Sequence, residues 1–307
     1  MMSPQITPIS MAPHAPAAYI SCMTRRHMSA CAAAAVALAC SLVIAAAIFY
    51  SAGAGESSAW DGGPHAKVRL VAGTADKAGT GMMHAGIEIQ LGPGWKTYWR
   101  YPGDSGVPPR FRFDRSDNVE TVAVLWPAPH GFSDDGGRSI GYKDGVILPL
   151  HVMPREPGKP VVLRLDLDYA VCERLCVPAE AKAELALMGG VENAALAASE
   201  ARVPKPVALG EGGALAIKAI HREAGPRPRI VVDVAAPVAA VVELFAEGPA
   251  ADWALPVPEP IAGAPSGLRR FAFVLDGVPP GASAQGAVIK LTAVTPEAAI
   301  EVQTRLD

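Results

Sequence analysis

The stretch VVLRLDLDYAVCERLCVPAEAKAELALM, residues 161–188, decides the fold that we expect for this chain. Every odd position from Val161 to Val171 is apolar or aromatic, and three of the positions between them are charged. A period of two is typical of a strand with one buried face. Residues 179–188 repeat the alternation. We therefore predict two paired or neighbouring strands, with the CERLC sequence at 172–176 in the turn between them.

Short apolar runs separated by turn residues continue on both sides of this stretch. The chain has 307 residues, of which 50% are hydrophobic, with 30 glycines and 29 prolines. That length favours two domains, and the composition favours many short strands. We predict one β-sandwich at residues 65–190 and a second at 207–307. Good helix formers occupy 191–204, so residues 191–206 are predicted to be a helical linker.

The N-terminal residues have the features of an export signal. A basic pair, Arg25 and Arg26, precedes an uncharged and mostly apolar run at 29–50, which is long enough to cross a bilayer. We predict that residues 1–54 are an export signal, or that 29–50 remain as an anchor in the inner membrane. The alternative is a buried core helix. An exported chain would lie where disulfides can form.

Charge and motif content exclude some classes of function. The net charge of −3 lacks the excess of basic residues that is typical of nucleic-acid-binding proteins, so we expect no nucleic-acid partner. Residues 207–307 contain no cysteine and no acid–base cluster. After the predicted export signal, only Cys172 and Cys176 remain as cysteines. The candidate chemistry therefore centres on this pair.

The spacing of the two cysteines leaves three readings open. A disulfide across four residues closes a small ring with little gain in loop entropy, which favours a bond that opens and closes over a structural staple. Cys172 is at an even position, as are the charged residues of its strand, so it should lie on the polar face. We therefore expect its thiol to be exposed. A structural surface disulfide is the second reading. A metal site is the third, and it is weaker because two thiols do not close a zinc site.

Two segments resemble a known family. They are GYKDGVILPLHVMPREPGKPVVLRLDLDYAVCERLCVPAEAKAELAL at 141–187 and the aromatic segment GPGWKTYWRYPGDSGVPP at 92–109. Both are similar to the N-terminal periplasmic domain of DsbD, the thiol:disulfide interchange protein, and to its ScsB-like relatives. The resemblance covers roughly residues 65–190. It implies an immunoglobulin-like sandwich, and in the ScsB-like relatives a second sandwich follows. The expected fold class is therefore all-β, with two immunoglobulin-like β-sandwich domains in tandem after the N-terminal signal or anchor helix.

The resemblance also implies a set of site residues. Cys172 and Cys176 would form the redox-active pair, with no other cofactor and no metal. The family's cap loop corresponds to residues 130–142 here, and the aromatic positions near the site correspond to two tyrosines. The candidates for the cap and for acid–base roles are Phe132, Asp134 and Asp135, and the site-lining aromatics are Tyr98 and Tyr142. The cysteine spacing is shorter than in the best-known DsbD proteins, and the acidic-aromatic order of the cap differs.

The function implied is a periplasmic thiol–disulfide interchange protein of the protein-disulfide reductase type. A membrane-embedded electron donor of the DsbD/ScsB type would reduce the dithiol, which would then reduce periplasmic thioredoxin-like proteins. No apolar run after residue 60 could span a bilayer, so the membrane-embedded donor is expected to be a separate protein, or the chain is a stand-alone relative with another donor. One alternative is a non-catalytic envelope binding module with a structural disulfide. Another is a copper-tolerance protein that binds copper through the thiols and Met82-Met83-His84.

Overall fold

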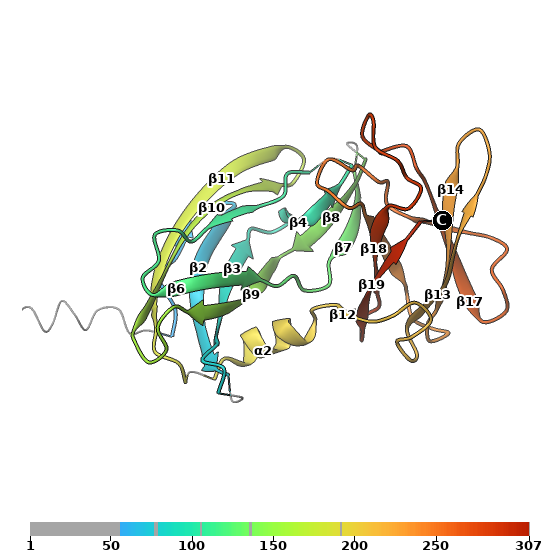
Figure 1. Cartoon of the computed structure of the whole chain (residues 1–307). Helices are drawn as coiled ribbons and strands as arrows, with labels where there is room; N and C mark the ends of the chain where they lie inside the picture. Colours follow the sequence, from blue (N-terminus) through green and yellow to red (C-terminus); the bar gives the residue numbers. More distant parts are fainter. Residues whose placement is uncertain (1–55, 77–78, 105, 135–136, 191, 307) are drawn as a thin grey trace, which may run out of the picture. The chain divides into compact units, whose positions relative to one another are not determined.

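The computed structural model of this chain describes residues 56–76, 79–104, 106–134, 137–190 and 192–306. The predicted export signal at 1–54 lies outside the described residues. Within the described ranges, no helix has both the length and the apolar character needed to cross a membrane. The described chain is almost entirely β-structure, as Figure 1 shows. The predicted all-β fold class is confirmed.

The first sandwich consists of two sheets. The five-stranded sheet has the order β1-β2-β3-β9-β6, and the other has the order β11-β10-β4-β8-β7, with β5 paired to β10. The strands of the first sheet are β1 (Asp61–Gly62), β2 (Ala66–Ala75), β3 (Met83–Leu91), β9 (Gly145–Pro154) and β6 (Val119–Val124). Those of the second are β11 (Cys176–Leu187), β10 (Val161–Cys172), β4 (Lys96–Gly103), β8 (Gly137–Lys143), β7 (His130–Asp134) and β5 (Arg110–Arg112).

The hairpin formed by β10 and β11 confirms the prediction made from residues 161–188. The two strands pair without a register shift from Val161 opposite Leu187 to Cys172 opposite Cys176. Along most of β10 the odd positions are buried and the even positions are partly exposed. The buried residues face the other sheet and join the main core of the first sandwich. This burial of one face by alternation is what holds the strand in register.

The second sandwich contains two four-stranded sheets. Their orders are β12-β19-β18-β15 and β13-β14-β17-β16, and between them lies a separate hydrophobic core. The strands are β12 (Lys205–Pro206), β13 (Ala216–Glu223), β14 (Arg229–Ala235), β15 (Glu243–Glu247), β16 (Glu259–Ile261), β17 (Leu268–Val274), β18 (Val288–Val294) and β19 (Ala299–Arg305).

Helix α2 (Ala194–Ala201) lies within residues 191–206, the segment predicted to be a helical linker. Asn193 caps its first turn by accepting the backbone N–H of Leu196 at 3.0 Å. The side chain of Leu196 is buried against the five-stranded sheet, where two glycines make room for it. A Cβ at Gly73 would lie 2.7 Å from Leu196 Cδ2, and one at Gly86 would lie 3.0 Å from Cδ1. The helix therefore packs on β2 and β3, and it also contacts β9 through a hydrogen bond from Ser199 Oγ to the carbonyl oxygen of Ile147.

An ion cluster joins β4 to the second sandwich. The guanidinium of Arg100 donates to Glu247 on β15 at 2.7 Å and to Glu301 on β19 at 2.5 Å. It also lies over the ring of Trp99, 4.2 Å from the centroid. Beside it, the hydroxyl of Tyr101 donates to the carbonyl oxygen of Leu255 at 2.6 Å. The carboxylates of Glu247 and Glu301 are only 14% and 20% exposed, and Arg100 is the cation that contacts both of them. Lys290 Nζ also lies 3.3 Å from Glu301.

We expect Arg100→Met to lower the free energy of unfolding by about 1–3 kcal/mol, because it removes the cation that Glu247 and Glu301 share and leaves Glu301 with Lys290 alone. Urea unfolding of the whole chain, followed by tryptophan fluorescence, measures the change. Arg112→Met is the matched control. Its ion pair with Asp168 is 51% and 42% exposed, so solvent screens it and its loss should matter far less. Equal effects of the two changes would contradict a special role for Arg100.

Candidate functional site

The cysteine pair forms a disulfide at the tip of the β10–β11 hairpin. Cys172 ends β10 and Cys176 begins β11, and their Cα atoms are 4.2 Å apart. The three residues between them are exposed, and the Leu175 side chain is 80% exposed. The predicted turn position of the CERLC sequence is correct. The bond lies where another protein can reach the hairpin tip.

The two sulfur-bearing residues differ in exposure. Cys172 is only 5% exposed and packs with Tyr98 and Ala170 in a small cluster of its own, whereas Cys176 is exposed. The expectation that Cys172 has an exposed thiol is wrong. The last residues of β10 are buried on both faces, because Tyr98 packs against Ala170 and Cys172 on the face that is partly exposed along the rest of the strand. A partner's thiol can therefore approach Cys176 more easily than Cys172.

Tyr98 supplies a polar contact to the exposed cysteine. Its hydroxyl lies 2.9 Å from Cys176 Sγ, although the residue itself is only 2% exposed. Gly106 makes this position possible, because a Cβ there would lie 2.7 Å from the Tyr98 ring and 2.4 Å from the Pro102 side chain. The structure thus brings the predicted aromatic to the sulfur. Sequence analysis missed Gly106, and its place in the GDSG turn was the only signal.

The segment predicted as a cap loop is largely a β-hairpin. β7 pairs with β8, and β8 pairs with β4, so residues 130–134 and 137–143 belong to the sheet that carries the cysteines. Phe132 lies near the site through Lys96, whose Nζ is 5.6 Å from the Phe132 ring centroid. Lys96 is the residue paired with Cys172 across the sheet. Asp134 ends β7 opposite Gly137, and Asp135 lies outside the described residues.

Lys96 is a functional candidate that sequence analysis did not identify. Its side chain is buried, at 8% exposure, and it follows the aromatic Trp95 at the start of β4. A cation next to a cysteine favours the thiolate over the thiol. Only the pairing of β4 with β10 reveals this neighbour, because Lys96 and Cys172 are far apart in the sequence.

Tyr142 is placed differently from Tyr98. Its hydroxyl donates to the carbonyl oxygen of Pro127 at 2.8 Å, and its ring belongs to the main core of the first sandwich. Burial raises the pKa of Tyr142 well above its usual value, so the hydroxyl stays protonated. This arrangement directs the Tyr142 hydroxyl to the backbone and not to a sulfur.

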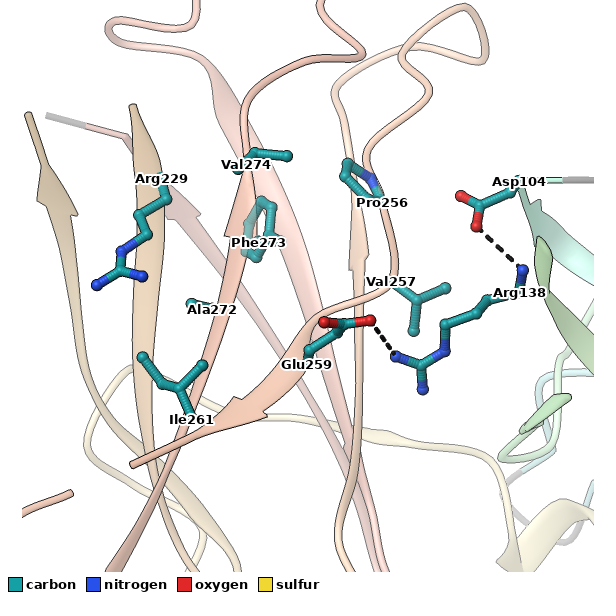
Figure 2. A pocket seen from close by; sticks show the side chains of 10 residues that line it. All are labelled: Asp104, Arg138, Arg229, Pro256, Val257, Glu259, Ile261, Ala272, Phe273 and Val274. Atoms are coloured by element: carbon teal, nitrogen blue, oxygen red, sulfur yellow. Dashed lines mark hydrogen bonds and ion pairs between the residues drawn. The ribbon is translucent and has the colours of Figure 1, made fainter. Parts of the chain in front are cut away.

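The second sandwich holds the β7–β8 hairpin by polar contacts. Glu243 on β15 accepts the backbone N–H of Gly131 at 2.7 Å and lies 2.9 Å from His130 Nδ1. The hydrogen bond to Glu243 raises the pKa of His130, with burial acting in the opposite direction. Figure 2 shows Arg138 of β8 facing Glu259 of β16. Arg138 Nη1 lies 3.6 Å from Glu259 Oε1, and both residues line a cavity of about 350 Å³. The hairpin next to the disulfide is therefore anchored by both sandwiches.

Fold and site together define an all-β domain with a disulfide at an accessible hairpin tip. A family model described as "Thiol:disulfide interchange protein DsbD, N-terminal" matches residues 70–187. Those residues therefore form a domain of the DsbD N-terminal family, which confirms the resemblance seen in the sequence. The match includes both cysteines, Tyr98 and the β7–β8 hairpin.

A solved structure extends the comparison to the second sandwich. The crystal structure of the N-terminal periplasmic domain of ScsB from Proteus mirabilis is 20% identical, with a TM-score of 0.62. The alignment covers 82% of this chain and 99% of that chain, which is more than the first sandwich alone. At this identity the likeness concerns the fold. Comparison with curated proteins gives no match.

We expect Tyr98→Phe to slow alkylation of the reduced protein by iodoacetamide about threefold at neutral pH. A hydrogen bond to a charged acceptor contributes roughly 1.5 kcal/mol, so its loss reduces the thiolate fraction about tenfold. The remaining thiolate becomes about threefold more nucleophilic as its basicity rises, which offsets part of the loss.

Tyr142→Phe is the control for this measurement. Tyr142 lies in the same sheet, but its hydroxyl donates to the backbone carbonyl of Pro127 and not to a sulfur. Loss of this hydroxyl should therefore leave the alkylation rate unchanged. An unchanged rate in Tyr98→Phe would show that the hydroxyl does not act on the reduced sulfur.

Proposed function

We propose that this chain is a periplasmic thiol–disulfide interchange protein that relays electrons to thioredoxin-like envelope proteins. The observation that carries the proposal is the asymmetric disulfide at the hairpin tip, with Cys176 exposed and Cys172 buried. Exchange needs one sulfur that a partner can attack and a second that resolves the mixed disulfide. In this reading the activity is that of a protein-disulfide reductase.

The oxidised protein accepts two electrons from a dithiol donor. A donor thiolate attacks Cys176 Sγ, the Cys172–Cys176 bond breaks, and Cys172 leaves as a thiolate that takes up a proton. The second donor thiolate then attacks the donor's own sulfur in the mixed disulfide. This step releases Cys176 as a thiolate and leaves the donor with a disulfide.

The reduced protein passes the same two electrons onward. The Cys176 thiolate attacks the disulfide of a thioredoxin-like partner, and one partner sulfur leaves as a thiolate. Cys172 then attacks Cys176 Sγ and displaces the second partner sulfur. The partner leaves as a dithiol after taking up two protons, and the Cys172–Cys176 bond is restored.

Neighbouring side chains support the leaving and attacking sulfurs. The Tyr98 hydroxyl is in position to donate to Cys176 when that sulfur carries negative charge, because the two atoms are already 2.9 Å apart. The buried Lys96 places a cation on the strand residue paired with Cys172. Phe132 shields the pair from solvent, and Asp134 or Asp135 supplies protons during exchange. Tyr98 and Lys96 have structural support here, whereas the proton donors rest on the family resemblance.

The location and the partners are part of the same proposal. The similar ScsB domain is described as periplasmic, and residues 1–54 have the pattern of an export signal or anchor. The electron donor is a membrane-embedded protein of the DsbD/ScsB type. The exposed Leu175 and Val177 beside Cys176 provide apolar surface for either partner at the hairpin tip.

We expect the two single-cysteine variants to form mixed disulfides with a partner at different rates. The Cys172→Ala variant retains the exposed Cys176 and should form a mixed disulfide with an oxidised thioredoxin-like protein. The Cys176→Ala variant retains the buried Cys172, and its mixed disulfide should form at least about tenfold more slowly, because burial restricts the approach of the partner. Non-reducing electrophoresis over time measures both rates.

Equilibration of the parent protein with glutathione redox buffers completes the test. A potential near that of thioredoxin-like proteins supports the relay, whereas a bond that resists strong reductants supports a structural disulfide in a binding module. Failure of both single-cysteine variants to trap any partner would also count against the relay.

A further inference from the structure

Two histidines and a glutamate meet on the five-stranded sheet, away from the cysteines. His84 on β3 is paired with His151 on β9, and the imidazole rings lie edge to face with centroids 4.8 Å apart. Glu200 reaches them from α2. One carboxylate oxygen, Glu200 Oε1, is 2.7 Å from His84 Nδ1 and 3.7 Å from His151 Nε2. Within the described ranges, this is the group of three such side chains close enough to hold a metal ion.

The distances between the candidate ligand atoms are close to those between the ligands of a metal ion. In a tetrahedral zinc site with bonds of about 2.0–2.1 Å, ligand atoms lie roughly 3.3 Å apart. The two contacts of Glu200 Oε1 fall on either side of that value, and all three candidate ligand atoms lie within 4.8 Å of one another. Rotation of three side chains, without movement of the strands, can bring the ligands to bonding distance.

The backbone already provides the support that such a site requires. His84 and His151 are directly opposite each other on hydrogen-bonded strands, so their Cα positions are held by the sheet. Glu200 is held by its helix, which is fixed by the buried Leu196 and by a hydrogen bond from Ser199 Oγ to the carbonyl oxygen of Ile147 at 2.5 Å. Rigid elements position ligands more accurately than loops do.

The surroundings leave room for a further ligand. His84 and Glu200 line a cavity of about 410 Å³, together with residues of the helix and the segment before it, including Glu192 and Asn193. The three side chains are between 21% and 31% exposed, so a cation from solvent can enter. Two imidazoles and one carboxylate with an open position suit zinc and other first-row divalent cations, and they contain no thiolate.

We propose that His84, His151 and Glu200 bind a first-row divalent cation, with zinc as the representative ion. The site is distinct from the one that the sequence suggested, in which Met82-Met83-His84 and the thiols would hold copper. Met83 packs against the main core, and the cysteines belong to the other sheet of the sandwich. The inference is independent of the thiol–disulfide function.

The consequence of occupancy is a tie between α2 and the sheet. The helix lies between the two sandwiches in the sequence. Its residue Glu200 makes the polar side-chain contacts with both His84 and His151. A cation that bonds to β3, β9 and α2 would resist separation of the helix from the first sandwich. Binding only to the folded state also raises the thermal midpoint of unfolding.

The test uses the full chain in its oxidised form, with the remaining free thiols alkylated so that they cannot bind metal. Isothermal titration with zinc chloride should show one site, and zinc at about a hundredfold over its dissociation constant should raise the unfolding midpoint by roughly 5 °C or more. His151→Ala and Glu200→Gln should each weaken zinc binding at least about tenfold. His221→Ala, which removes a histidine from β13 of the second sandwich, is the matched control and should bind as the parent does.

Cobalt provides a second readout that does not depend on stability. The cobalt-loaded parent should show visible d–d bands of nitrogen and oxygen ligation, without a thiolate charge-transfer band, and both variants should lose them. Circular dichroism of the metal-free variants checks that they are folded. Equal zinc affinity in the parent and in folded Glu200→Gln and His151→Ala would overturn the proposal, as would a thiolate band or no zinc binding at millimolar concentration.

Discussion

The pairing of the end of β10 with the start of β4 is the constraint on which the candidate site depends. Val171 and Cys172 pair with Thr97 and Lys96, and Thr97 Oγ1 donates to the carbonyl oxygen of Ala170 at 2.9 Å. Beside this pairing, the Tyr98 side chain packs against Ala170 and Cys172 and covers the face of β10 that is partly exposed along the rest of the strand. The arrangement buries one cysteine, leaves the other exposed, and places the Tyr98 hydroxyl beside the exposed sulfur.

β4 also links the disulfide region to the second sandwich. Its first residues contact the cysteines, and the next ones, from Trp99 to Tyr101, contact β15, β19 and the segment after β15. The β7–β8 hairpin makes a second link, because it pairs with β4, donates the Gly131 N–H to Glu243, and forms an ion pair between Arg138 and Glu259. The second sandwich therefore contributes to the rigidity of the strands around the site, although it has no cysteine of its own. Such rigidity suits a disulfide whose two sulfurs need different exposure.

The two proposed sites lie on opposite sheets of the first sandwich and use different chemistry. The cysteine pair lies at the end of a hairpin, where a protein partner can reach it. The histidine–glutamate group lies where α2 crosses β3 and β9, in a partly enclosed position suited to a small ion. The main core separates the sheets. The proposed electron relay and the proposed metal binding thus use different residues, and each can be tested without changing the residues of the other.

The sequence by itself determined the local elements of this protein. Alternation at residues 161–188 predicted the hairpin, its turn and the position of the cysteines, because a period of two directly reports a strand with one covered face. Motif resemblance identified the family of residues 70–187. Only the tertiary structure decided that Cys172 is buried, that residues 130–134 and 137–143 are strands, and that His84 meets Glu200, which is 116 residues away in the chain. Alternation records the face that a strand turns to its own core, and it carries no information about which distant strand or helix will cover the opposite face.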